Sequence, residues 1–192
     1  MISVLGYAAW QHQLRREGPT VQAREEAAIS LSTEQGFPHW LVVGTFLRGW
    51  ALAAQGQAEE GIAQLQQGLA AWRAIGTKLG LPAILLLLAE AYGKAGQVEV
   101  GLQTLAEALA LVDQTQERVY EAELYRLQGE LLLARSAEHH AEAETCFRHA
   151  LDVARRQQAK SLELLAPIYG WFTEGFDTKD LQEAKALLEA LQ

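Results

Sequence analysis

The chain has 192 residues, 49% hydrophobic and 21% charged, which is enough apolar material for a folded core. Its net charge of −8 argues against binding nucleic-acid phosphates, and the doublets Arg15-Arg16 and Arg155-Arg156 are interpreted as solvated surface. A lone cysteine, Cys146, excludes an internal disulfide framework and favours a reducing, cytoplasmic compartment. The longest apolar run is interrupted by Glu90 and is too short to cross a membrane.

Helical periodicity runs through the whole chain, and nothing alternates with period two for long enough to be a strand. Pro19, Pro38 and Pro82 lie near the starts of segments, where a missing N–H costs nothing. Gly56 and Gly96 follow the first helix of their units, where a left-handed C-cap suits glycine. We expect a single all-α domain, residues 1–192, built from helix pairs at about 40 residues per unit. The expected units are 3–36, 37–76, 77–116, 117–158, and a shortened fifth unit with a cap at 159–192.

Four of these units share a small–large–small–large pattern, with offsets of 40 and 42 residues between units. The first unit matches the last two positions with Ala28 and Ile29. Small residues are expected where two helices approach closely, and a lone pair cannot bury both faces, so the pairs should stack into an α-solenoid. The pattern is Gly61, Leu65, Gly68 and Leu69 in the second unit, Gly101, Leu105, Ala108 and Leu109 in the third, and Ala143, Phe147, Ala150 and Leu151 in the fourth.

The stretch "LLLLAEAYGKAGQVEVGLQTLAEAL" resembles a tetratricopeptide repeat (TPR), because Leu85, Leu88, Ala89, Tyr92, Gly96, Gly101, Leu105 and Ala108 fall on its signature spacings. Nearly the whole chain, including "TEQGFPHWLVVGTFLRGWALAAQGQAEEGIAQL", is similar to the C-terminal TPR region of bacterial predicted ATPases, which are often fused to adenylate/guanylate-cyclase-like domains. The resemblance implies a right-handed superhelix that senses or binds in signal transduction, with catalysis in upstream domains. In that family a further helix and turn stand where Leu164 and Leu165 are fused here, which predicts a shortened fifth pair.

Catalytic motifs are missing from the sequence. It contains no phosphate loop, no G-x-S-x-G elbow, no H-E-x-x-H and no C-x-x-C. His140, Glu144, Cys146 and His149 come closest to a metal site, but the two pairs point in different directions on one helix. We therefore expect no enzyme activity, no cofactor and no metal, with Cys146 packed.

A partner-binding groove is predicted along the first helices of the pairs, which line the concave side of such a stack. Its mixed charge suits a protein or peptide partner better than a polyanion. The alternative is plain helix packing, with Glu123 and Arg126 pairing at i, i+3, and Trp10, Trp40 and Trp72 are interpreted as wedges between helices. The candidate groove residues are Arg48, Trp50, Glu90, Lys94, Glu123, Arg126 and Glu130.

The stretch "YGWFTEGFDTKDL", residues 169–181, is interpreted as the start of a C-terminal capping helix rather than a ligand-binding loop. Asp177 fits an N-cap, and Phe176 and Leu181 occupy hydrophobic-staple positions. The predicted function is a non-catalytic protein-interaction scaffold with no nucleic-acid or membrane partner. The alternative is a self-assembling scaffold, a homo-oligomer formed through helix faces left uncovered at the ends of the solenoid.

Overall fold

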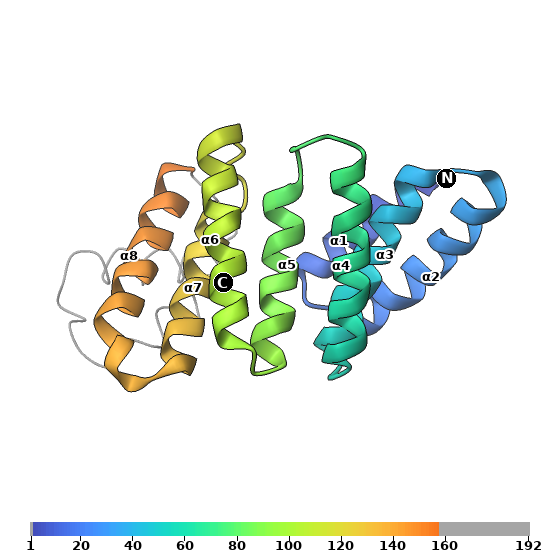
Figure 1. The fold of residues 1–192 in the computed structure, drawn as a ribbon. Coiled ribbons are helices and arrows are strands. Elements are labelled where there is room, and N and C mark those ends of the chain that lie inside the picture. The colour runs from blue at the N-terminus through green and yellow to red at the C-terminus, as the bar shows by residue number, and fades with distance from the viewer. Residues whose placement is uncertain (1, 158–192) are drawn as a thin grey trace, which may run out of the picture. The chain divides into compact units, whose positions relative to one another are not determined.

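The computed structural model describes residues 2–157, with side chains except at residues 2–5, 7 and 137. This part of the chain is all-helical and contains no strand (Figure 1). The expected fifth unit, the Leu164–Leu165 fusion and the cap at 159–192 lie outside the described residues. The helices are α1 (Ile2–Leu14), α2 (Gly18–Gln35), α3 (Pro38–Ala54), α4 (Ala58–Ala74), α5 (Leu81–Lys94), α6 (Val98–Thr115), α7 (Glu121–Arg135) and α8 (His140–Arg156), with a 3₁₀ turn (Ala137–His139) before α8.

The helices fall into two compact units that divide between Glu117 and Arg118. In the first unit each of α1 to α5 packs on the next helix along the chain, and the first helices of the pairs also touch, α1 on α3 and α3 on α5. In the second unit α7 packs on α8. The eight α-helices fall within the first four expected repeat ranges to within one residue. That the whole chain forms a single domain stays a prediction.

Prolines and glycines set the helix ends as expected. Pro38 is the first residue of α3, and Pro19 and Pro82 are the second residues of α2 and α5. Gly56 and Gly96 take the left-handed conformation, with φ of +90° and +74°. After each glycine the next backbone N–H returns to a carbonyl of the preceding helix, from Gln57 to Leu52 and from Gln97 to Tyr92, at 2.9 Å in both cases.

Small residues allow the helices to touch at the predicted positions. A Cβ at Gly61 would lie 2.5 Å from the Gly49 carbonyl oxygen and 2.7 Å from the Ala53 nitrogen, so α3 and α4 meet backbone to backbone. A Cβ at Gly68 would lie 2.8 Å from Cβ of Phe46, also on α3. Both positions confirm that the small slots of the repeat mark close helix contacts.

In the second unit a larger side chain fills the corresponding repeat position between the two helices. Phe147 occupies the slot of Leu65 and Leu105, and its ring would lie 2.5 Å from a Cβ added at Gly129 of α7. The glycine therefore gives the phenyl ring its space, and Phe147 is only 2% exposed.

Aromatic rings fill the space among α1, α3 and α4, as predicted for the tryptophans. Trp10 and Trp72 each meet Phe46 edge to face, with ring centroids 5.9 and 6.0 Å apart. The Trp40 ring lies against Gly6 of α1. Such pairs add about 0.5–1.5 kcal/mol each beyond the area they bury. Within the described residues, no helix has the length and apolar character needed to cross a bilayer.

Candidate functional site

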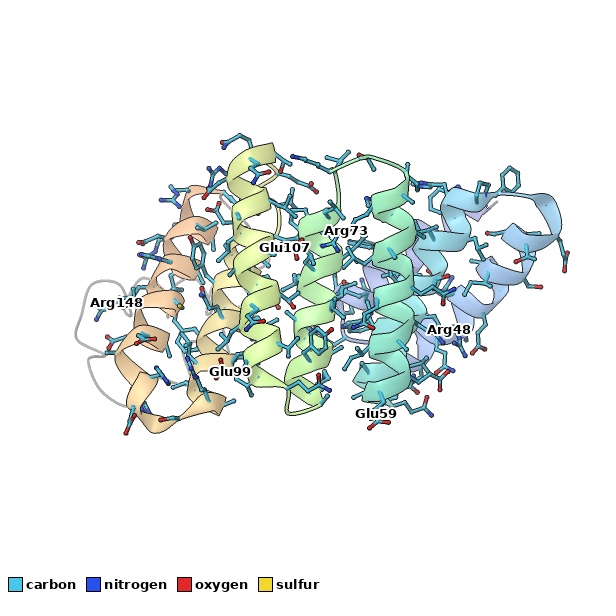
Figure 2. All side chains as sticks on the ribbon, viewed as in Figure 1. Arg48, Glu59, Arg73, Glu99, Glu107 and Arg148 are labelled. Atoms are coloured by element: carbon cyan, nitrogen blue, oxygen red, sulfur yellow. The ribbon has the colours of Figure 1, made fainter. Side chains whose placement is uncertain are left out.

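The predicted groove residues do not gather in one place. Arg48 lies between α2 and α4, the second helices of their pairs, as Figure 2 shows. Its Nε is 3.3 Å from Oε1 of Glu26 and its Nη1 is 3.8 Å from Oε1 of Glu60. Arg48 therefore serves as a bridge between two neighbouring helices on the side of the second helices.

Trp50, Glu90 and Lys94 do come together, on α3 and α5. The Trp50 indole donates to Oε2 of Glu90 at 3.1 Å, and Nζ of Lys94 is 3.7 Å from Oε1 of Glu90. The fourth member is Arg16, whose Nη1 lies 2.6 Å from Oε2 of Glu90. We call these four residues the Glu90 cluster. Trp50 is 1% exposed, so its ring offers no open surface.

Arg16 corrects the interpretation of the first arginine doublet as plain solvated surface. It stands in the turn between α1 and α2 with φ of +61°, and it ties that turn to α5. Sequence reasoning missed the pair because its members are far apart in the chain, and no local spacing signals it.

In the second unit, Glu123, Arg126 and Glu130 form a network along α7. Arg126 donates to both carboxylate oxygens of Glu123, at 2.6 and 2.7 Å, and also to Glu130. Arg126 is 7% exposed and Glu123 9%. The i, i+3 pairing that served as the plain alternative is thus confirmed, and contact of these residues with a partner stays a prediction.

A hollow of about 280 Å³ lies between α4 and α6, with α5 as its floor. We call it the α4–α6 furrow. At its rim Nη2 of Arg73 on α4 reaches Oε1 of Glu107 on α6 at 2.5 Å, and Figure 2 shows the two labelled side chains together. Gln66 donates to the Tyr92 hydroxyl at 2.7 Å. The lining residues are Gln66, Leu69, Ala70, Arg73, Leu85, Leu88, Tyr92, Thr104 and Glu107.

The repeat explains why the chain has a hollow here. At the offset of 40 residues, Leu88 occupies the position of Arg48. Arg48 extends between α2 and α4 and is held there by Glu26 and Glu60. The shorter, uncharged Leu88 cannot span the corresponding space between α4 and α6. Aligning the two repeats at Arg48 and Leu88 is the sequence signal that could have found the furrow.

The helices on either side of the furrow are acidic. Their charged residues are five carboxylates, Glu59, Glu60, Glu99, Glu107 and Asp113, and one arginine, Arg73. All six are exposed. Of these six, Arg73 and Glu107 line the furrow itself. An apolar floor flanked by two helices of net negative charge favours a ligand that combines a large apolar group with positive charge.

The residues weighed as a metal site do not form one. In the part of the chain that the structure describes, no three His, Cys, Asp or Glu side chains gather as a possible metal group. The His149 ring packs on Tyr125, with centroids 5.3 Å apart. Cys146 is half-buried, and burial, followed by the nearby Glu142, raises the pKa of its thiol. A thiol in that environment is not an activated nucleophile.

Comparison with known proteins gives a relative but no family. No family model matches the chain. Over 114 residues the chain is 32% identical to an uncharacterized protein of Rhizobium meliloti (strain 1021). The match covers 59% of this chain and 11% of that protein, so the chain spans about a tenth of the length of this relative. The similarity therefore concerns one part of a much longer protein.

Proposed function

We propose that this chain is a TPR-like α-solenoid with a right-handed superhelix, and that it acts as a non-catalytic cytoplasmic scaffold in signalling. Two observations support the solenoid. The helix pairs follow a repeat of about 40 residues, and the small slots of that repeat coincide with backbone contacts such as Gly61 on Gly49. The ligand we propose is a polypeptide segment of another protein.

The α4–α6 furrow carries this proposal. Its apolar lining of Leu69, Leu85 and Leu88 can take one large apolar side chain, and its volume of about 280 Å³ is close to that of small ligand sites. Glu107 at the rim, and exposed carboxylates elsewhere on α4 and α6, would pair with Lys or Arg residues that flank this side chain. The segment we propose therefore has one apolar anchor between basic residues.

The Arg73–Glu107 pair at the rim would yield to such a segment at little cost. Both side chains are about half exposed, 48% and 49%. An exposed ion pair contributes only about 0–1 kcal/mol. A basic side chain of the ligand can replace Arg73 beside Glu107, so this carboxylate remains paired in the bound state.

The test is selection of 12-residue peptides from a random display library, followed by fluorescence anisotropy with the selected peptides. We expect enrichment of sequences with Leu or Phe between Lys or Arg residues. Ala70→Trp, which fills the furrow from its exposed rim, should weaken binding at least tenfold. Ala106→Trp is the matched control, because Ala106 is exposed on α6 and does not line the furrow.

Two outcomes would count against the furrow. If Ala70→Trp binds as the wild type does, the ligand lies elsewhere. If Lys94→Glu combined with Arg126→Glu abolishes binding instead, the predicted groove residues hold the ligand. A library that yields no binder to the wild type would contradict the scaffold itself.

Self-assembly is the second candidate function. Ile75 and Leu79, in the loop between α4 and α5, are 53% and 67% exposed, and Phe37 is 45% exposed. Exposed apolar side chains favour association where they form one contiguous patch. Light scattering after size-exclusion chromatography over a hundredfold concentration range decides between the two functions. A dimer that Leu79→Ser dissociates would support assembly, and a monomer throughout would exclude it.

A further inference from the structure

Glu25 occupies a core position that the other repeats fill with a large apolar residue. At the offsets that define the repeat, it takes the place of Leu65, Leu105 and Phe147. Glu25 stands in the middle of α2 and is 1% exposed. Neither of its carboxyl oxygens has a hydrogen-bond partner. The first helix pair is therefore built around a buried, unsatisfied carboxyl group.

The carboxyl group is pressed against α3. A Cβ added at Gly44 would lie 3.0 Å from Oε2 of Glu25 and 2.8 Å from Cγ1 of Ile29, so only a glycine of α3 leaves room there. Loss of water around the buried group raises the pKa of Glu25 from 4.5 to about 8. The group is accordingly neutral while α2 and α3 stay together at neutral pH.

Nearby charges do not compensate Glu25. Among the described side chains of α1, α2 and α3, no titratable group forms an ion pair with Glu25. His12 of α1 pairs with Glu17 at 2.5 Å, and Arg48 of α3 pairs with Glu26 and Glu60. Glu34 accepts a hydrogen bond from Ser30, and the His39 ring packs on Trp40 and Trp72. Nε of Arg24 is itself buried without a hydrogen-bond partner.

The α1–α2 pair is attached to the rest of its unit mainly through α3. Both helices pack on α3, and the ion pair of Arg16 with Glu90 adds a tie to α5. The Arg16 side chain of that ion pair is 41% exposed and the Glu90 side chain 12%. The attachment therefore consists of the α1–α3 contact, the α2–α3 contact that includes Glu25, and this single ion pair.

We propose that the α1–α2 pair is a displaceable segment, which separates from α3 when Glu25 loses its proton. Separation lets the carboxylate reach water, uncovers the α3 face around Gly44, and frees Glu90 from Arg16. This device is independent of whether the α4–α6 furrow binds a polypeptide. It would make the Glu90 cluster accessible at alkaline pH and closed at acid pH.

Hydrogen exchange with mass spectrometry on the full chain, from pH 5 to pH 9 under EX2 conditions, tests the proposal. After correction for intrinsic rates, protection of α2 amides should fall about tenfold per pH unit between roughly pH 5 and pH 8. Protection of α5 and α6 amides should stay constant over the same range. Glu25→Gln and Glu25→Leu should remove the pH dependence in α2.

Gly44→Ala is the control for packing. The added methyl group disturbs the same α2–α3 contact without changing a charge, so it should lower α2 protection by a similar factor at every pH. The proposal is overturned if α2 protection in the wild type does not depend on pH, or if Glu25→Gln keeps the wild-type slope. It is also overturned if α5 and α6 lose protection together with α2, since the charge would then act on the whole unit.

Discussion

The contact between α3 and α4 at Gly61 gives a prediction whose size can be worked out from the structure. In Gly61→Ala, the new methyl carbon would lie 2.5 Å from the Gly49 oxygen, 2.7 Å from the Ala53 nitrogen and 2.8 Å from Cβ of Ala53. Two of these neighbours are backbone atoms and cannot rotate away. Because ordinary contacts need roughly 3.5–4.0 Å, α3 must move away by about 1 Å.

Two opposing effects decide the stability change. Overpacking a well-packed contact costs about 1–3 kcal/mol. Alanine in place of glycine inside a helix returns about 0.8–1.0 kcal/mol. We therefore expect the free energy of unfolding to fall by up to about 2 kcal/mol. Gly49→Ala should have a similar effect, since its methyl group would meet the Gly61 oxygen at 2.8 Å.

Urea unfolding followed by circular dichroism measures the change. Gly18→Ala is the matched control, because a Cβ there would meet its nearest atoms, Cβ of Ala54 and Cγ of Gln55, at an ordinary 3.5 Å. It should leave the free energy of unfolding unchanged or raise it by up to about 1 kcal/mol. If Gly61→Ala proves as stable as Gly18→Ala, helix propensity outweighs packing and the close contact is not as described.

The remaining predictions concern buried charge. Arg126→Gln should lower the free energy of unfolding by about 1–3 kcal/mol, because it leaves the mostly buried Glu123 carboxylate without its guanidinium. Arg148→Gln, which breaks an exposed pair with Glu144, should change it by less than about 1 kcal/mol, and equal losses in urea unfolding would contradict this reasoning. For Glu25, the unfolded chain releases its proton near pH 4.5 and the folded chain near pH 8. The free energy that holds the α1–α2 pair on α3 should therefore fall by about 1.4 kcal/mol per unit as pH rises through this window, and Glu25→Leu should abolish the fall. A free energy of α2 opening, measured by hydrogen exchange, that is flat from pH 5 to pH 8 would sink this prediction.

Local rules predicted much of the fold from the sequence. Proline placement marked the starts of α2, α3 and α5, and Gly56 and Gly96 marked turns, because these effects depend on one or two residues. The small slots at Gly61 and Gly68 were predictable because the repeat shows them several times over. The solenoid arrangement beyond these helix pairs remains a proposal.

Features that depend on helix faces and distant partners were harder to predict. Arg48 and Trp50 are two residues apart on α3, which places them about 200° apart around the helix, so both could not line one groove. That conflict was visible in the sequence. The tie between Arg16 and Glu90 was not, because it depends on how the α1–α2 turn meets α5.

The first repeat held a further signal that sequence reasoning passed over. Only its last two pattern positions, Ala28 and Ile29, match the other units, and the slot of Leu65 holds Glu25. A charged residue in a core slot indicates either exposure or a buried ionisable group. Only the three-dimensional arrangement shows that Glu25 is buried, at 1% exposure.

The central claim is that the α4–α6 furrow binds a polypeptide segment. The most direct measurement is a nuclear magnetic resonance titration of the ¹⁵N-labelled chain with a library-selected peptide. We predict that the largest shift changes fall on residues that line the furrow, such as Gln66, Leu88 and Thr104. Changes confined to Glu90, Lys94 and Arg126, or no changes at saturating peptide, would contradict the account.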